Sequence, residues 1–175
     1  MAPDWSATDI PGVHRRSSAV IADRRGSFTE LWRASTTDEL TSAPFVQANL
    51  SRSSTGVLRG MHFHRRQTDL WMLVEGRAFV ALADLRDRSP DGPPNVTTFE
   101  MSPGDAVLIP EGVAHGFHAI EPIALLYLVT GEYDGSDELG FAWNDPLAAI
   151  RWPDPSPILS DRDAANPPLS SISAG

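Results

Sequence analysis

The chain of 175 residues is long enough for one domain with a sizeable core, and its formal net charge of −9 at pH 7 argues against a nucleic-acid partner. It contains no cysteine, which excludes disulfides, thiolate zinc sites and a cysteine nucleophile. No apolar run approaches the roughly 18 residues that cross a bilayer, and the first residues lack the apolar stretch of a signal peptide. We therefore expect a cytoplasmic protein with no membrane partner.

Short apolar runs between 15 prolines and 13 glycines predict the secondary structure. We expect β-strands over residues 17–21, 27–33, 45–50, 57–64, 70–75, 77–85, 97–101, 106–109, 115–120 and 123–130. Long amphipathic helical patterns are missing, so the sequence predicts an all-β sandwich or barrel.

The expected domain organisation is a single unit over residues 1–175. Its core covers about residues 17–133, where the strand patterns lie. After residue 134 the pattern becomes irregular and includes a short helix, so residues 134–168 are expected to pack on the barrel. Residues 169–175 are the last of the chain and are expected to form a mobile tail.

Strand alternation predicts the direction of three polar side chains. His62 and His64 lie two residues apart in the expected strand 57–64, so they point the same way. In the strand 123–130 the odd positions share a face, and because three of the four are apolar, Tyr127 is expected to point into the barrel. A histidine suits both proton transfer and metal binding, so both interpretations stay open.

Two spacings of glycine, histidine and proline mark the middle of the chain. One comprises Gly56, His62, His64, Asp69 and Gly76, and the other comprises Gly104, Pro110, Gly112 and His115. They resemble the paired motifs of the cupin superfamily, although that pattern normally has Glu at the position of Asp69 and Asn at that of Ala119. The resemblance implies a double-stranded β-helix, or jelly-roll barrel.

In metal-binding cupins the corresponding residues hold one divalent first-row metal ion. The resemblance therefore implies a possible ligand set of His62, His64, Asp69 and His115, because imidazoles and one carboxylate suit such an ion. The alternative is that the same residues are polar groups that line a ligand pocket without metal.

Longer pieces of the sequence resemble one cupin family, the dTDP-4-dehydrorhamnose 3,5-epimerases. The pieces are "DRRGSFTELW" (23–32), "FVQANLSRS" (45–53), "GVLRGMHF" (56–63), "ALADLRDRSP" (81–90), "IPEGVAHGF" (109–117), "LYLVTGEY" (126–133), "WNDP" (143–146) and "LSDRDAANP" (159–167). The resemblance implies an isomerase that epimerises C3, C5 or both in a dTDP-linked 4-keto-6-deoxyhexose through an enolate. It also implies no cofactor and a homodimer that exchanges strands.

The resemblance assigns three catalytic residues. His62 of the "RG.H" motif would remove the proton next to the ketone, Asp163 would orient the imidazole, and Tyr127 would return a proton to the opposite face. Taken alone, Tyr127 is equally well a core tyrosine and Asp163 a helix cap.

The resemblance also implies a set of substrate contacts. They are Arg25, Phe28, Glu30, Gln47, Asn49, Arg59, His115, Tyr133 and Arg162. The residues from Arg25 to Glu30 are expected to reach the site of the partner subunit, because the dimer shares strands. The partners are thus a small dTDP-sugar and a second copy of the chain.

One position departs from the family. Alignment on Gln67 and Gly76 places Asp69 where the family has a lysine that stabilises the enolate oxygen. A carboxylate there opposes the developing negative charge. Three alternatives follow: Arg65 or Arg66 supplies the cation, a metal ion polarises the ketone, or the enzyme catalyses another reaction.

Three functional hypotheses remain open from the sequence. The first is the metal-free epimerase, the second a metal-dependent cupin isomerase or cyclase, and the third a non-catalytic sugar-binding cupin. A metal on His62 would occupy the lone pair that a base needs, so the first two exclude each other at that residue. The departure at Asp69 favours the deoxysugar of a secondary metabolite over cell-wall rhamnose.

Overall fold

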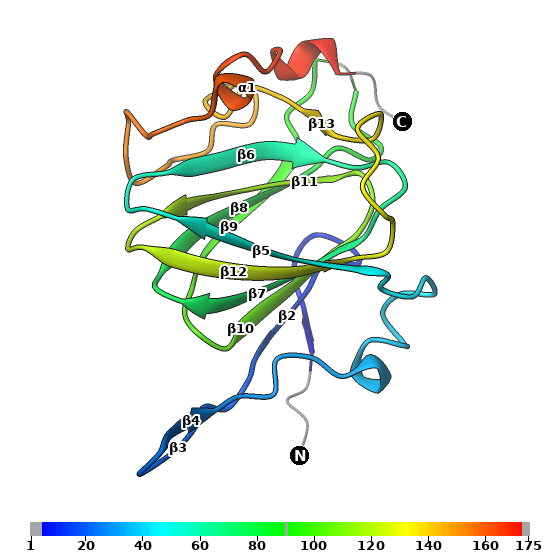
Figure 1. Cartoon of the computed structure of the whole chain (residues 1–175). Coiled ribbons are helices and arrows are strands. Elements are labelled where there is room, and N and C mark those ends of the chain that lie inside the picture. Colours follow the sequence, from blue (N-terminus) through cyan, green and yellow to red (C-terminus); the bar gives the residue numbers. More distant parts are fainter. Residues whose placement is uncertain (1–4, 90, 173–175) are drawn as a thin grey trace.

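The computed structural model describes residues 5–89 and 91–172, and almost all of its regular structure is β-strand (Figure 1). The strands are β1 (Ser6–Ala7), β2 (His14–Ser17), β3 (Ile21–Asp23), β4 (Gly26–Phe28), β5 (Gln47–Ser53), β6 (Leu58–Phe63), β7 (Asp69–Glu75), β8 (Ala78–Asp84), β9 (Asn95–Met101), β10 (Asp105–Ile109), β11 (Val113–Ala119), β12 (Ile123–Val129) and β13 (Leu139–Gly140). The helical elements are η1 (Ala34–Thr36), α1 (Asp161–Ala164) and η2 (Leu169–Ser171).

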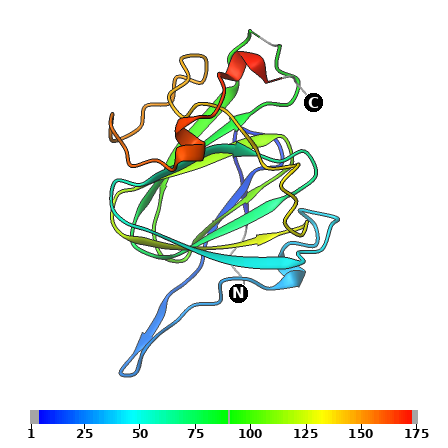
Figure 2. The same cartoon turned by 45° about the horizontal axis from the view of Figure 1, so that its top comes forward.

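Two antiparallel sheets face each other and form the barrel. One has the strand order β1-β2-β10-β7-β12-β5, and the other has the order β13-β6-β11-β8-β9. The β3–β4 hairpin forms a separate small sheet that projects from the barrel in both views (Figure 2). This arrangement confirms the predicted cupin jelly roll with a short helix near the C-terminus.

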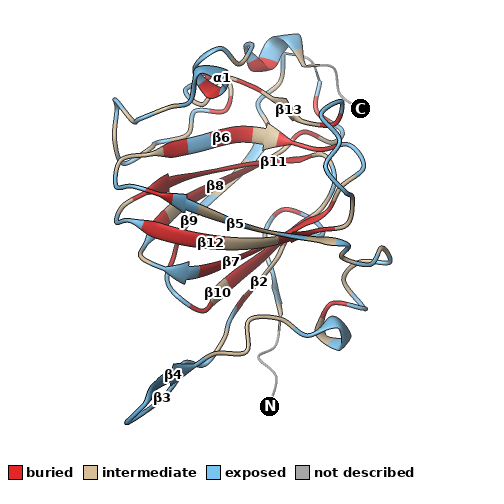
Figure 3. Ribbon diagram, viewed as in Figure 1, coloured by how far each residue is buried: buried red, intermediate tan, exposed pale blue. Residues whose placement is uncertain are grey.

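Side chains of the central strands alternate between two apolar layers. On β12, Ile123 and Leu125 pack between the sheets, whereas Leu126 and Leu128 pack on the outer face of the six-stranded sheet. Both faces of such a strand are covered (Figure 3), and it therefore reads as a continuous apolar run in the sequence. Tyr127 packs against the inner cluster, which confirms the predicted inward direction.

The C-terminal segment covers the outer face of the five-stranded sheet. Phe141, Ala148 and Leu169 pack there in one cluster with residues of the sheet such as Met61. Leu169 is fully buried, and the Arg88 guanidinium donates hydrogen bonds to the carbonyl oxygens of Leu169 and Ile172. Residues 169–172 are therefore packed against the protein rather than part of a mobile tail, and residues 173–175 lie outside the described residues.

The N-terminal strands differ from the prediction. The strand expected over residues 17–21 is wrong, because Ser17 ends β2 and Ile21 begins β3. The strand expected over residues 27–33 is reduced to β4. These apolar residues do not face the core: Ile21 is 63% exposed and Phe28 66% exposed. Among the described residues, no helix is long and apolar enough to cross a membrane.

Candidate active site

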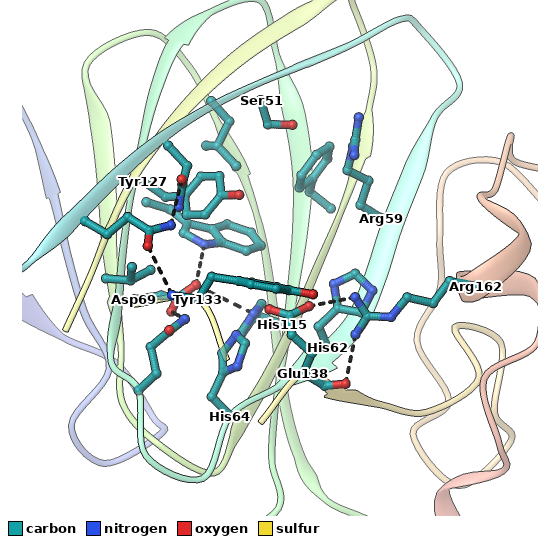
Figure 4. A pocket seen from close by; sticks show the side chains of 17 residues that line it. Ser51, Arg59, His62, His64, Asp69, His115, Tyr127, Tyr133, Glu138 and Arg162 are labelled. Carbon is teal, nitrogen blue, oxygen red and sulfur yellow. Dashed lines mark hydrogen bonds and ion pairs between the residues drawn. The ribbon is translucent and has the colours of Figure 1, made fainter. Parts of the chain in front are cut away.

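A cavity of about 440 Å³ lies between the two sheets (Figure 4). Its lining residues are Gln47, Asn49, Ser51, Arg59, His62, His64, Gln67, Asp69, Trp71, His115, Phe117, Leu125, Tyr127, Val129, Tyr133, Glu138 and Arg162. The cavity thus brings together two of the three expected catalytic residues and six of the nine expected substrate contacts. The third catalytic candidate, Asp163, lies behind the lining.

His62 and Asp163 form the closest polar pair of the site. Nε2 of His62 lies 2.5 Å from Oδ1 of Asp163, although the two residues are 101 positions apart in the sequence. Asp163 is buried at the start of α1, where its backbone N–H donates to the hydroxyl of the cap residue Ser160. The short helix therefore fixes the carboxylate, and the carboxylate fixes the imidazole.

The charge state of Asp163 follows from its surroundings. Burial raises the pKa of its carboxyl group, but the hydrogen bond and charge of His62, together with the backbone N–H of Gly60, outweigh burial and lower that pKa below 3.8. The carboxylate is thus ionised at neutral pH. Because the carboxylate is ionised, the hydrogen of the His62–Asp163 hydrogen bond is carried by Nε2 of His62. The lone pair of Nδ1 on His62 is therefore free.

An irregularity in strand pairing places Arg59 on the cavity side. His115 pairs with His62 but Phe117 pairs with Arg59, so β6 has one more residue than β11 at this point. Such a bulge disrupts strict alternation, and Arg59 and His62 therefore both line the cavity. Gly60 lies at the bulge with φ +140°, and a Cβ there would lie 2.6 Å from Cα of Gly116.

Tyr127 faces His62 from the opposite sheet. It lies on β12, whereas His62 lies on β6, and Figure 4 shows the two side chains on opposite sides of the cavity. Burial raises the pKa of the Tyr127 phenol, and the carboxylates of Asp69 and Glu138 raise it further. The phenol is therefore protonated at neutral pH and available as a donor.

A second polar cluster lies deeper in the same cavity and consists of His64, Asp69 and His115. One ligand atom of each of the three lies within 4.8 Å of the others, and all three residues are buried. Asp69 accepts hydrogen bonds from the side-chain amide of Gln67 at 2.8 Å and from the indole N–H of Trp71 at 3.2 Å. His62 is not in the group, so the predicted four-residue ligand set needs correction: His62 is held by Asp163 instead.

The cavity has two cationic lining residues, Arg59 and Arg162, among the residues that the structure describes. Arg162 donates to the Glu138 carboxylate at 2.6 Å, and Arg59 donates to the Ser53 hydroxyl at 3.0 Å. The structure does not place Arg65 or Arg66 in the cavity lining, so neither takes the place of the missing lysine.

The remaining three expected contacts lie outside the cavity. Arg25 pairs with Asp23 on the exposed hairpin, Glu30 pairs with Arg33, and Phe28 is exposed. The hairpin that carries Arg25 and Phe28 points away from the barrel (Figure 2).

Several lining residues were missed by the sequence analysis. Ser51 follows Gln47 and Asn49 at alternate positions of β5, so strand periodicity could have identified it. Trp71 follows Asp69 in the same way on β7. Glu138 comes from an irregular segment next to β13, and no periodic signal marks it.

Comparisons with known proteins identify the family of the chain. The family model described as dTDP-4-dehydrorhamnose 3,5-epimerase matches residues 7–171. The enzyme of that name from Salmonella typhimurium is 38% identical over 170 residues, with 93% of both chains covered. The one from Neisseria gonorrhoeae is 37% identical over 164 residues, which are 90% of this chain but 50% of that protein.

Solved structures give the same result. NovW, a 4-keto-6-deoxy sugar epimerase from the novobiocin biosynthetic gene cluster of Streptomyces spheroides, has a TM-score of 0.86 and 33% identity over 97% of this chain and 89% of its own. The Legionella pneumophila epimerase in complex with dTDP-4-keto-L-rhamnose has a TM-score of 0.87 and 32% identity over 98% of this chain and 95% of its own. The chain therefore belongs to the dTDP-4-dehydrorhamnose 3,5-epimerase family and is an epimerase, an enzyme of the isomerase class.

Proposed function

We propose that the enzyme epimerises a dTDP-linked 4-keto-6-deoxyhexose at C3, C5 or both, with His62 as the base and Tyr127 as the acid. The observation that carries the proposal is the His62–Asp163 pair, which faces a protonated tyrosine across one cavity. Family membership supports the substrate class, and the complex of the Legionella pneumophila relative with dTDP-4-keto-L-rhamnose supports it further.

The base acts through Nδ1 of His62. Its Nε2 donates to the Asp163 carboxylate, so Nδ1 accepts the proton from the carbon next to the ketone. The imidazolium that forms is stabilised by the adjacent negative charge, and its ring is held in one orientation. Asp163 thus acts as a positioning residue, because it touches the base and not the sugar.

The acid acts on the other face of the sugar. Loss of the proton gives a planar enolate, and a proton returned by Tyr127 from the opposite sheet gives the inverted configuration. The raised pKa keeps the phenol protonated until that step.

The nucleotide part is proposed to bind toward the outer region of the cavity. Arg59 and Arg162 are the candidates for the diphosphate, since guanidinium groups bind phosphate oxygens in pairs. Gln47 and Asn49 are proposed contacts of the nucleotide or sugar. Tyr133 is 74% exposed, as expected of a ring that stacks on a base at the entrance.

The working form is proposed to be a homodimer in the cytoplasm. The β3–β4 hairpin exposes Ile21 and Phe28, and β5 at the sheet edge exposes Leu50 by 56%. Exposed apolar residues on an edge strand and a projecting hairpin are typical of a protein interface. The hairpin would carry Arg25 and Phe28 to the partner's cavity, which explains why they lie far from their own.

Incubation of the untagged enzyme with dTDP-4-keto-6-deoxyglucose in D₂O tests the proposal. Mass spectrometry is expected to show uptake of one deuterium if one carbon is epimerised and of two if both are. The outcome that contradicts the proposal is an unchanged mass after prolonged incubation with folded enzyme that still binds dTDP. Membership in an enzyme family already argues against the non-catalytic cupin.

A further inference from the structure

We propose that His64, Asp69 and His115 form a binding site for one divalent first-row transition-metal ion inside the cavity, separate from the His62–Asp163 pair. Asp69 lies on β7, His115 lies on β11 and His64 directly follows β6, so the two sheets bring the three residues together. Two imidazoles and one carboxylate are a common ligand set for such ions, and they leave further coordination positions open.

The imidazoles are oriented as metal ligands normally are. Nδ1 of His64 lies 2.8 Å from the carbonyl oxygen of Asp137, and Nδ1 of His115 lies 3.2 Å from the carbonyl oxygen of Val113. Each Nδ1 therefore carries the hydrogen and donates to a backbone carbonyl, so each Nε2 has a free lone pair. Metal-bound histidines show this same outer hydrogen bond, which fixes the tautomer and the ring.

The loop that holds His64 is itself anchored. The Asp137 carboxylate accepts hydrogen bonds from the backbone N–H groups of Arg65 and Arg66 at 3.0 and 3.1 Å. Asp137 therefore does two things: its carbonyl oxygen orients the His64 imidazole, and its carboxylate holds the backbone directly after His64. The direction of this imidazole is built into the fold, and does not depend on a mobile side chain.

The carboxylate has room for a cation. Each oxygen of Asp69 accepts one hydrogen bond, from Gln67 or from Trp71, and keeps a second lone pair. Nε2 of His115 lies 3.8 Å from Oδ2 of Asp69. Ligand atoms about 2.1 Å from a metal ion lie roughly 3.4 Å apart at the tetrahedral angle, so small side-chain rotations close the site.

The electrostatics of the cavity favour a cation at this point. Asp69 is 3% exposed, and among the described residues it has no arginine partner. The chain contains no lysine at all. The ion-pair partner of Asp69 is the imidazole of His115, 3.8 Å away. A buried carboxylate with so little charge compensation is costly to keep ionised, and coordination to a metal ion offsets that cost.

The site and the base do not compete for the same residue. His62 keeps its lone pair, because the cluster does not include it. Both groups line the same cavity, so the open coordination positions face the space where the sugar is proposed to bind. A divalent cation held there would supply Lewis-acid stabilisation of a carbonyl oxygen; this use rests on the epimerase function proposed above.

The test measures metal binding directly and needs no substrate. Untagged protein is stripped with EDTA, dialysed and titrated with Zn²⁺ by calorimetry, and the metal content of the untreated protein is measured by mass spectrometry. We expect about one ion per chain, with micromolar or tighter affinity. Asp69→Asn and His115→Gln are each expected to weaken binding at least about 100-fold.

Two control variants make the result specific. His62→Asn is expected to bind Zn²⁺ as the unmodified protein does, although it loses epimerase activity. His118→Gln changes the other buried histidine of β11, which does not line the cavity, and is also expected to leave binding unchanged.

The proposal is overturned if the unmodified protein binds Zn²⁺ only in the millimolar range. It is also overturned if Asp69→Asn binds as well as the unmodified protein, or if His62→Asn weakens binding as much as Asp69→Asn does. These results leave the epimerase proposal untouched, because deuterium uptake is measured separately. Conversely, an enzyme that binds Zn²⁺ through the three residues but exchanges no deuterium contradicts the proposed function and not the site.

Discussion

At the scale of single residues, the His62–Asp163 pair shows how a four-residue helix positions the proposed base. Ser160 caps α1, the cap fixes Asp163, and Asp163 orients His62. The motifs that carry these residues predict the pair correctly. Only the family resemblance predicts that Arg59 lines the cavity. Strict strand alternation would place Arg59 and His62 on opposite faces of β6, and the bulge removes that difference.

Asp163→Asn is expected to lower the free energy of unfolding at pH 7 by about 1–3 kcal/mol, because a charge-assisted hydrogen bond is lost. The folded-state pKa of Asp163 lies below the ordinary 3.8, so its stabilisation is complete above pH 3.8 and disappears as the pH falls through the lower folded-state value. Urea unfolding of both proteins between pH 7 and pH 2 measures the difference.

Asp161→Asn is the matched control, because Asp161 lies in the same first helical turn but is exposed. Its effect is expected to stay within about 0.5 kcal/mol at every pH. A stability difference for Asp163→Asn that grows on acidification would contradict the lowered pKa.

Tyr127→Phe is expected to separate proton removal from inversion. His62 still removes the proton and returns one to the same face, so deuterium uptake continues. The inverted product is expected to form at least about 100-fold more slowly. Chromatography of the product sugars alongside mass spectrometry checks both. Tyr133→Phe, which changes the other tyrosine of the chain, should leave the ratio of inversion to exchange as it is. Equal losses of exchange and inversion in Tyr127→Phe would rule out its role as the acid.

At the scale of elements, the sequence predicts the barrel strands well. The strands from β5 to β12 appear within a few residues of their predicted ranges. Strands such as β7 and β12 have both faces covered, so they read as apolar runs, whereas β5 and β9 leave part of their length exposed. The N-terminal predictions fail because Ile21 and Phe28 are apolar without facing a core. A single sequence contains no signal that separates an exposed apolar strand from a core strand.

The paired strands β6 and β11 approach each other closely at Gly60. Gly60→Ala is expected to destabilise the protein by about 3 kcal/mol or more, since the new Cβ would lie 2.6 Å from Cα of Gly116 at a φ of +140°. Gly26→Ala is a close control, because Gly26 has a φ of +135° but no atom within 4 Å of an added Cβ. Urea denaturation of both variants measures the contribution of close approach alone. Equal destabilisation would show that backbone conformation, and not packing against β11, requires glycine at residue 60.

The projecting hairpin is expected to hold the dimer together. The double variant Ile21→Ser, Phe28→Ser removes two exposed apolar side chains, so it is expected to shift the protein from dimer to monomer in light scattering coupled to gel filtration. Ile158→Ser serves as the control, because Ile158 is 60% exposed and lies outside the hairpin. A dimer of undiminished affinity in the double variant would exclude the hairpin from the interface.

At the scale of the whole molecule, each of the two sheets contributes one proposed proton-transfer residue to the same cavity. One sheet carries His62 and the other carries Tyr127, so the architecture of the barrel places the proposed base and the proposed acid on opposite sides of the cavity. The motifs predict this barrel, but not the separation of His62 from the cluster of His64, Asp69 and His115. That separation depends on the position of α1, which the spacing of the motifs does not contain.

The most direct test of the central claim is a proton NMR time course of dTDP-4-keto-6-deoxyglucose in D₂O with the unmodified enzyme, His62→Asn and the surface control His14→Asn. The unmodified enzyme and His14→Asn are predicted to remove the C3 or C5 proton signal at the same rate. His62→Asn, with its fold confirmed by circular dichroism, is predicted to be at least about 100-fold slower. Exchange by His62→Asn at the rate of the unmodified enzyme would contradict the assignment of His62 as the base.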